Sequence, residues 1–163
     1  VLGTSYIFPF ERFRPKKKND VSVSSTKIRA LLNEGDIERA NKYLGYKYML
    51  SGNVVHGDKM GRTINYPTAN IEVDKNKLIP NSGVYLVKIT FQSEDFFGML
   101  NIGIETNKIE VHVFNFSKEI YGQKIIIKLI NRLRDVMSFK NSQALKKQLQ
   151  NDENECKAIL GIQ

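Results

Sequence analysis

The residues best suited to chemistry begin between positions 57 and 62. Gly57 and Gly61 allow the backbone to turn tightly and to present N–H groups to an anion. Lys59 and Arg62 add positive charge to the same loop, and an arginine can bind two phosphate oxygens at once. The loop lacks the GxxxxGK(S/T) pattern of P-loop nucleotide hydrolases. Taken alone, it is either a phosphate-binding loop or a hairpin loop with solvated cations.

The Pro-Thr-Ala-Asn sequence at residues 67–70 carries two oxygen donors. Pro67 restricts the backbone, and we expect Thr68 and Asn70 on the same side of the strand that follows. A hydroxyl and an amide oxygen are hard ligands that suit Mg²⁺ shared with the phosphates of a nucleotide. The alternative is an ordinary strand entry in which Thr68 and Asn70 make local turns.

A carboxylate stands in a later segment, for which the alternation predicts a strand over residues 109–117. One face of this strand would carry Ile109, Val111 and Val113, and the other Glu110, His112, Phe114 and Phe116. A carboxylate among aromatic side chains is a candidate general base. The alternative is a solvated strand glutamate.

The elements that must position these residues change character near residue 48. Before it, the spacing predicts two short helices. Ser24 or Ser25 caps the first, which ends at Gly35, and Asp36 caps the second, which ends at Gly45. Residues 1–23 follow no regular period.

After residue 48, apolar side chains recur with a period of two. This predicts strands near residues 48–56, 69–74, 83–93, 96–103, 109–117 and 123–131. A helix is predicted over residues 142–160, with Ser142 as its cap. Its apolar stripe consists of Leu145, Leu149, Ile159 and Leu160. Six short strands at this spacing indicate a closed antiparallel barrel or a sandwich.

Composition narrows the class of protein. The 163 residues contain one cysteine, Cys156, which excludes an internal disulfide and a cysteine-based metal site. The two histidines, His56 and His112, do not form an HxGH or HExxH motif. No apolar run approaches the roughly 20 residues of a membrane span, and no signal peptide is recognisable. We therefore expect no membrane partner and a place in the cytoplasm.

The net charge of +8 raises the question of a nucleic-acid partner. Residues 51–120, which contain the unusual motifs, carry 7 basic and 8 acidic side chains and are not basic. Of the 25 cations in the chain, 18 are lysines, whereas nucleic-acid grooves favour clustered arginines with aromatic side chains. We therefore expect no nucleic-acid partner.

Together, these blocks resemble the signature of the riboflavin kinase family over about residues 45–160. The resemblance begins at residues 67–70 and continues through residues 83–85 (GVY), 98–103 (GMLNIG), 110–112 (EVH), Phe116, Tyr121-Gly122, 133–135 (LRD) and Phe139. Two positions depart from the family pattern. Asn65 stands where the family commonly has glycine, and residues 104–106 (IET) replace the usual Arg-Pro-Thr.

The resemblance implies a mainly β fold: a six-stranded antiparallel Greek-key barrel with two short N-terminal helices and one C-terminal helix. It implies phosphoryl transfer from ATP to riboflavin with Mg²⁺, giving FMN, by a monomer. Glu110 would be the catalytic base, and Thr68 and Asn70 the metal ligands. The ATP-binding residues would be Gly57, Lys59, Gly61, Arg62, Thr68, Asn115 and Tyr121. Arg134 and Phe139 would contact the flavin, and His112 would be structural.

Bacterial members of this family usually carry an FMN adenylyltransferase on the same chain. Residues 24–29 resemble the SSTxxR motif that closes such adenylyltransferases. We therefore interpret residues 1–46 as the tail of an adenylyltransferase module with linker helices, and residues 47–163 as the kinase domain. Without HxGH, we expect no FMN adenylyltransferase activity. Two alternatives are a flavin-binding module without kinase activity and a basic barrel that binds single-stranded nucleic acid.

Overall fold

The computed structural model describes residues 24–57, 60–104 and 108–162, apart from the side chains of Met60 and Arg62. Lys59 and the irregular segment at residues 1–23 lie outside the described residues. The elements are α1 (Ser25–Glu34), α2 (Ile37–Leu44), β1 (Met49–Val55), the 3₁₀ helix η1 (Met60–Ile64), β2 (Ala69–Val73), β3 (Gly83–Phe91), β4 (Glu94–Ile102), β5 (Ile109–Val113), β6 (Lys124–Arg134) and α3 (Ser142–Leu160).

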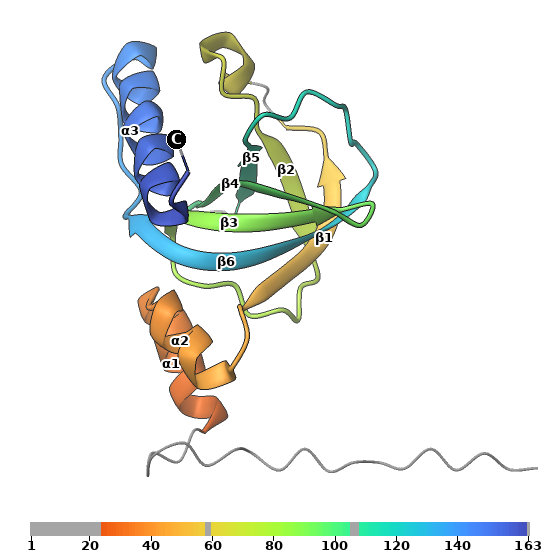
Figure 1. Cartoon of the computed structure of the whole chain (residues 1–163), viewed down its shortest axis with the longest axis vertical. Coiled ribbons are helices and arrows are strands. Elements are labelled where there is room, and N and C mark those ends of the chain that lie inside the picture. Colours follow the sequence, from red (N-terminus) through yellow and green to blue (C-terminus); the bar gives the residue numbers. More distant parts are fainter. Residues whose placement is uncertain (1–23, 58–59, 105–107, 163) are drawn as a thin grey trace, which may run out of the picture.

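The six strands form a closed barrel in the order β1-β2-β5-β4-β3-β6, with every neighbouring pair antiparallel (Figure 1). Because β5 lies between β2 and β4, the connection from β2 to β3 skips a neighbour, which is the Greek-key arrangement. The predicted mainly β barrel with two N-terminal helices and one C-terminal helix is confirmed, and the sandwich alternative is wrong.

Two hydrophobic clusters explain which strand residues are buried. The larger fills the barrel with inward-facing side chains such as Leu50, Ile71 and Val111. The smaller lies under α3 and consists of Tyr66, Val84, Leu86, Met99, Phe114 and Cys156. The first seven residues of β3 are almost all buried because its two faces belong to the two clusters.

Helices α1 and α2 cover one end of the barrel (Figure 1). Their predicted caps are confirmed: Ser24 accepts a hydrogen bond from the backbone N–H of Lys27 and Asp36 from that of Arg39, and glycines in the left-handed conformation end both helices. Leu32 and Ile37 belong to the barrel cluster. The two helices therefore share a core with the barrel, and the domain boundary at residue 46 stays a prediction.

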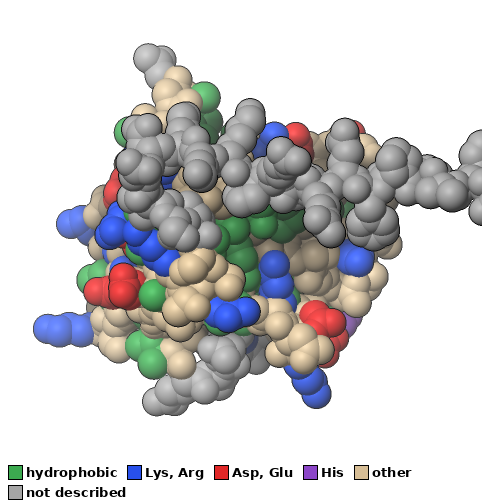
Figure 2. Space-filling model, turned by 90° about the horizontal axis from the view of Figure 1, so that it is seen from below, with side chains coloured by type: hydrophobic (Ala, Val, Ile, Leu, Met, Phe, Trp, Pro, Cys, Tyr) green, Lys and Arg blue, Asp and Glu red, His purple; other side chains and the backbone are tan. Residues whose placement is uncertain are grey.

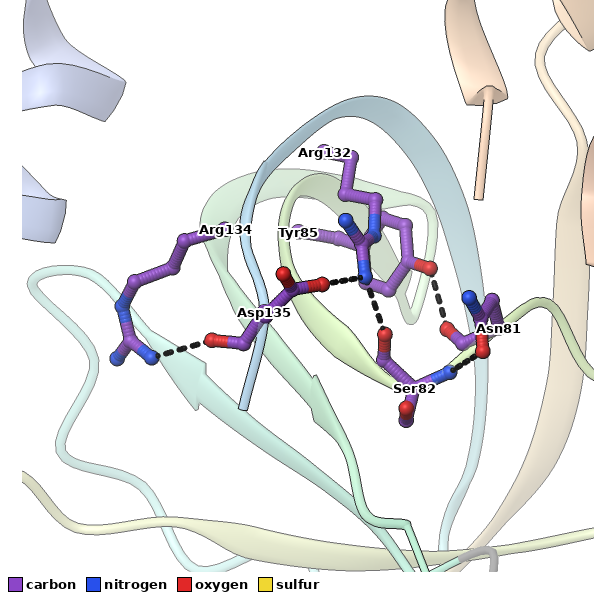
Figure 3. A network of polar contacts seen from close by, with 6 residues as sticks. All are labelled: Asn81, Ser82, Tyr85, Arg132, Arg134 and Asp135. Carbon is purple, nitrogen blue, oxygen red and sulfur yellow. Dashed lines mark hydrogen bonds and ion pairs between the residues drawn. The ribbon is translucent and has the colours of Figure 1, made fainter. Parts of the chain in front are cut away.

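Arg132 connects the loop before β3 to the segment after β6 (Figure 3). Its Nη2 donates to the carbonyl of Ser82 at 2.6 Å and to Oδ1 of Asp135 at 2.6 Å. Its guanidinium lies 5.9 Å from the ring centroid of Tyr85, whose hydroxyl donates to the carbonyl of Asn81. These contacts hold the ends of β3 and β6 together.

Several predicted boundaries are wrong for local reasons. Strand β5 ends at Val113 rather than at 117, because a turn at Phe114 and Asn115 interrupts it, with φ of 52° at Asn115. Phe114 therefore packs under α3 and Phe116 against the barrel cluster, so the two rings do not continue the face of Glu110. Strands β3 and β4 meet in a two-residue hairpin at Gln92 and Ser93, both with positive φ.

The C-terminal helix spans residues 142–160 as predicted, but its cap and part of its apolar stripe differ from the prediction. Asn141, one residue before Ser142, is the N-cap, and its side chain accepts from the backbone N–H of Ala144 at 2.8 Å. Ile159 is 44% exposed and does not belong to the contact surface. Leu149 and Leu160 of the predicted stripe do pack against the barrel, together with Cys156 and next to the buried Asp152.

Candidate functional site

A cavity of about 470 Å³ opens at the end of the barrel where β1 finishes. Since β1 starts beside α2, this is the end away from the two N-terminal helices (Figure 1). The cavity is lined by the inward faces of β1, β2 and β5 and by two loops: Val54, Asn65, Pro67, Thr68, Ala69, Val111, Val113, Phe116, Ser117, Lys118, Glu119, Ile120 and Tyr121. Thr68 and Tyr121 are thus brought together, while Asn115 is exposed and is not among the lining residues.

An aromatic stack stands at the edge of this cavity. The rings of His56 and Tyr121 are parallel to within 26°, with centroids 3.9 Å apart. Lys118 lies in the same loop as Tyr121 and lines the cavity. Neither His56 nor Lys118 was predicted as a site residue, although His56 directly precedes Gly57. A flat surface beside a cation suits a nucleotide base and its phosphates.

Asn70 and Glu110 lie directly opposite each other on β2 and β5. On the other side of β5, Asn101 of β4 is paired with Glu110, so the carboxylate stands between two amide side chains on one face of the sheet. Nζ of Lys108 lies 3.5 Å from Oε1 of Glu110. The predicted aromatic surroundings of Glu110 are therefore wrong: its cross-strand neighbours are polar.

Asn70 is only 8% exposed and packs against the backbone of Gly57. A Cβ on Gly57 would stand 1.4 Å from Nδ2 of Asn70, so no larger residue fits there without moving the amide. Of the two expected metal ligands, Thr68 lines the cavity and Asn70 is buried beside Glu110. Thr68 directly precedes β2 and Asn70 is its second residue, and their role as ligands of one cation stays a prediction.

The loop from Gly57 to the start of β2 contains η1 and closes on itself. The N–H of Tyr66 donates to the carbonyl of Gly61 at 2.8 Å, and a Cβ on Gly61 would lie 2.1 Å from the carbonyl oxygen of Tyr66. Asn65 has a φ of 64°, a left-handed conformation that asparagine tolerates better than most residues. This conformation explains why asparagine can occupy a position at which glycine is common in the family.

Tyr66 ties this loop to α3. Its hydroxyl donates to Oε2 of Glu153 at 3.1 Å, and Glu153 also contacts Nζ of Lys157 at 3.0 Å. Burial, together with the hydrogen bond to Glu153, raises the pKa of Tyr66 to about 12. The neutral phenol therefore remains the donor at physiological pH.

Arg134 and Phe139, the expected flavin contacts, lie on the α3 side of the barrel and not at the cavity. Nε and Nη2 of Arg134 donate to the two carboxylate oxygens of Asp152 at distances of 2.7–3.1 Å. Nη1 of Arg134 also donates to the carbonyl of Asp135 (Figure 3), and its guanidinium lies 6.0 Å from the ring centroid of Phe139. Arg134 is thus an anchor of α3, and its flavin contact stays a prediction.

On the face seen in Figure 2, the described basic side chains are scattered among acidic ones and form no continuous stripe. This face is the end of the molecule that carries α1 and α2, opposite the cavity (Figure 1). Within the described residues, no group of three or more His, Cys, Asp or Glu could hold a metal ion by itself. None of the helices in the described part of the chain has the length and apolarity to cross a bilayer.

Comparison with known proteins finds similar sequences among proteins of flavin metabolism. The family model "Flavokinase: Riboflavin kinase" matches residues 44–160. A bifunctional riboflavin kinase/FMN adenylyltransferase from Listeria monocytogenes is 43% identical over 144 residues, which cover 84% of this chain and 46% of that protein. One from Buchnera aphidicola is 41% identical over 160 residues, covering 93% and 51%. The chain therefore spans about half the length of these curated relatives.

Solved structures agree on the fold. A crystal structure described as a macrolide-efflux protein from Streptococcus pneumoniae superposes with a TM-score of 0.81 at 33% identity, covering 88% of this chain and 49% of that one. Riboflavin kinase from Trypanosoma brucei superposes with a TM-score of 0.51 at 24% identity, covering 69% and 79%. The second likeness concerns the fold alone.

Proposed function

The chain belongs to the riboflavin kinase family, and on that premise we propose that its barrel transfers the γ-phosphate of ATP to the 5′-hydroxyl of riboflavin, giving FMN and ADP. The observation that carries this proposal is the pairing of Asn70 with Glu110 on neighbouring strands, together with Thr68, which stands two residues before Asn70 and lines the cavity. Phosphoryl transfer needs a base or orienting group for the alcohol and oxygen donors for a metal–phosphate complex, and these residues supply both.

Glu110 would accept the proton of the ribityl hydroxyl as that oxygen attacks phosphorus. Lys108 contacts this carboxylate and two amide side chains stand beside it on the neighbouring strands, which supports a polar position for the reacting hydroxyl. Thr68 and Asn70 would hold Mg²⁺ together with phosphate oxygens. When bound, this ion would neutralise charge that develops on the phosphates.

The substrates would approach from different directions. We assign the phosphates of ATP to the loop of Gly57, Lys59, Gly61 and Arg62, and the nucleotide to the cavity that includes Thr68 and Tyr121, with Asn115 nearby. The stack of His56 on Tyr121 supports a flat binding surface for the base. Arg134 and Phe139 are proposed on the flavin side, where their mutual contact would place an aromatic ring for stacking.

Replacing Glu110 by Gln tests the proposal most directly. The amide keeps the shape but cannot take a proton, so we expect kcat for FMN formation to fall by roughly 10²–10⁴-fold while both substrates still bind. Glu72→Gln is the matched control, because Glu72 is an exposed glutamate on the adjacent strand β2. Turnover of Glu110→Gln near that of the parent would reject Glu110 as the base.

The same assay separates the alternatives. Chromatography of riboflavin, FMN and FAD after incubation with Mg-ATP is expected to show FMN as the product. Riboflavin binding without any FMN would favour a flavin-binding module without kinase activity. We propose the kinase reaction alone for these 163 residues, so FAD that accumulates in proportion to enzyme would contradict this part of the proposal.

A further inference from the structure

We propose that His112 is a positioning residue that holds the metal-binding segment in place through the carbonyl of Pro67. Nδ1 of His112 lies 2.8 Å from this carbonyl oxygen, although the two residues are 45 positions apart. A carbonyl can only accept a hydrogen bond, so Nδ1 carries the proton. The inference rests on the proposed kinase reaction, because its consequence concerns the binding of MgATP.

The place of His112 in the barrel makes this hydrogen bond specific. His112 stands two residues after Glu110 on β5, so both side chains project from the same face of the strand. Pro67 stands one residue before Thr68, at the entry to β2. One strand therefore carries the proposed base and also a donor to the segment that carries both proposed metal ligands.

Pro67 gives the segment few other hydrogen-bonding groups. A proline has no backbone N–H, so its carbonyl is its only backbone hydrogen-bonding group. The loop before it turns through the left-handed conformation of Asn65, and residues 66–68 belong to no strand. The hydrogen bond from His112 therefore acts where the backbone changes from the loop to β2.

The imidazole itself is held from two sides. Its centroid lies 5.1 Å from the ring of Tyr66 and 5.8 Å from that of Phe114. Tyr66 is fixed in turn by its hydrogen bond to Glu153 of α3. This packing restricts the rotation of the imidazole, so His112 can transmit the position of β5 to the carbonyl of Pro67.

Loss of this hydrogen bond should affect one substrate more than the other. A displacement of about 1 Å at a positioning segment can cost up to about 10²-fold in rate. We therefore expect His112→Leu to lower kcat/KM for MgATP and to raise the Mg²⁺ concentration needed for half activity, each by roughly 10-fold or more. The dissociation constant for riboflavin should change by less than about 2-fold, since we assign riboflavin to the side of Arg134 and Phe139.

The conservative variant is His112→Asn, whose side-chain amide can stand near the position of Nδ1 and donate to Pro67. It should restore most of kcat/KM for MgATP.

Phe114→Leu is the packing control, because it disturbs the other side of the same imidazole without removing the donor. It should lower the melting temperature and reduce kcat/KM for MgATP much less than His112→Leu does, because the donor to Pro67 is still present. If His112→Leu does not fold, His112→Gln, whose amide lies one methylene farther out, takes its place in the comparison with His112→Asn.

The outcomes separate the inference from the proposed function. If the parent protein forms no FMN from riboflavin and Mg-ATP, the kinase proposal fails, and this inference fails with it. If the parent forms FMN but His112→Leu leaves kcat/KM for MgATP unchanged, only the positioning role is wrong. Equal losses for MgATP and riboflavin, or no recovery in His112→Asn, would show that His112 merely supports the fold.

Discussion

Replacing Arg134 by Met should destabilise the protein through the contact between β6 and α3. The carboxylate of Asp152 is only 1% exposed and receives hydrogen bonds from Nε and Nη2 of Arg134 and from Nε2 of Gln148. The methionine side chain would fill a similar volume but carry no charge. Asp152 would then be a buried carboxylate with no cation beside it.

The expected loss of unfolding free energy follows from the burial of Asp152. Breaking a buried ion pair by removing one partner typically costs about 3–5 kcal/mol. Gln148 still donates one hydrogen bond to Asp152, and the side chain of Arg134 is 17% exposed, so the lower end of this range, about 3 kcal/mol, is expected. For a protein of this size, that corresponds to a fall of about 6–12 °C in melting temperature.

The double variant Arg134→Met, Asp152→Leu separates the two possible roles of Arg134. It removes both charges from the buried site, so most of the lost stability should return. Urea unfolding measures stability, and quenching of riboflavin fluorescence measures flavin affinity. If stability returns and riboflavin affinity returns with it, Arg134 acts through α3. If stability returns and affinity does not, Arg134 contacts the flavin.

Two results would refute the reasoning about the ion pair. The first would be a free energy of unfolding for Arg134→Met that differs from that of the parent by less than about 0.5 kcal/mol, which is the usual range for exposed sites away from special features. The double variant could be no more stable than Arg134→Met. Either result would mean that Asp152 does not depend on Arg134.

Two further predictions concern the loop before β2. Gly57→Ala should displace the amide of Asn70 and lower kcat/KM for MgATP by at least about 10-fold, since positioning errors of this size are costly. Gly103→Ala, where the nearest atom would be 3.5 Å from the new Cβ, should leave turnover nearly unchanged. Tyr66 has a pKa raised from 10.0 to about 12, so its contribution to stability is present below pH 10 and is lost as the pH rises toward 12. Tyr66→Phe should therefore show a smaller loss of unfolding free energy between pH 10 and 12, and an unchanged loss would mean that burial and Glu153 do not raise the pKa of this phenol.

Local sequence determined the elements, because the signals for them are local. Ser24 and Asp36 cap their helices in the structure as predicted, since a cap needs only a side-chain oxygen and a nearby backbone N–H. The alternation predicted that Ile109, Val111 and Val113 share one face of a strand, and all three are buried in β5. The same alternation placed Glu110 and His112 on the outward face.

Where the local sequence signal was ambiguous, packing against neighbouring elements decided where a strand ends. The apolar residues after Val113 looked like a continued strand, but Phe114 is buried under α3 and Asn115 takes a positive φ. No residue within the segment indicated that a helix from the end of the chain would cover it. The Gln92–Ser93 hairpin was likewise hidden, because it uses two residues that are uncommon in such turns.

In the candidate site, too, some features follow from local sequence and others only from long-range packing. Thr68, Asn70 and Glu110 were identified as candidates from residue type and spacing, but only the register between β2 and β5 sets Asn70 opposite Glu110. Register depends on the packing of the whole barrel, since a slip by one residue would turn each side chain to the other face. It joins residues 40 positions apart, beyond the reach of any local pattern.

Tertiary structure alone decided the contacts that hold the site in place. His112 meets Pro67 across 45 residues, and Arg134 meets Asp152 only because α3 packs back onto β6. In both cases, each residue by itself has an ordinary solvated alternative, and its role depends on a partner that arrives through folding. Sequence therefore determined which residues could act, and the closed barrel with its covering helix decided which of them meet, because long-range contacts form only when the whole core packs together.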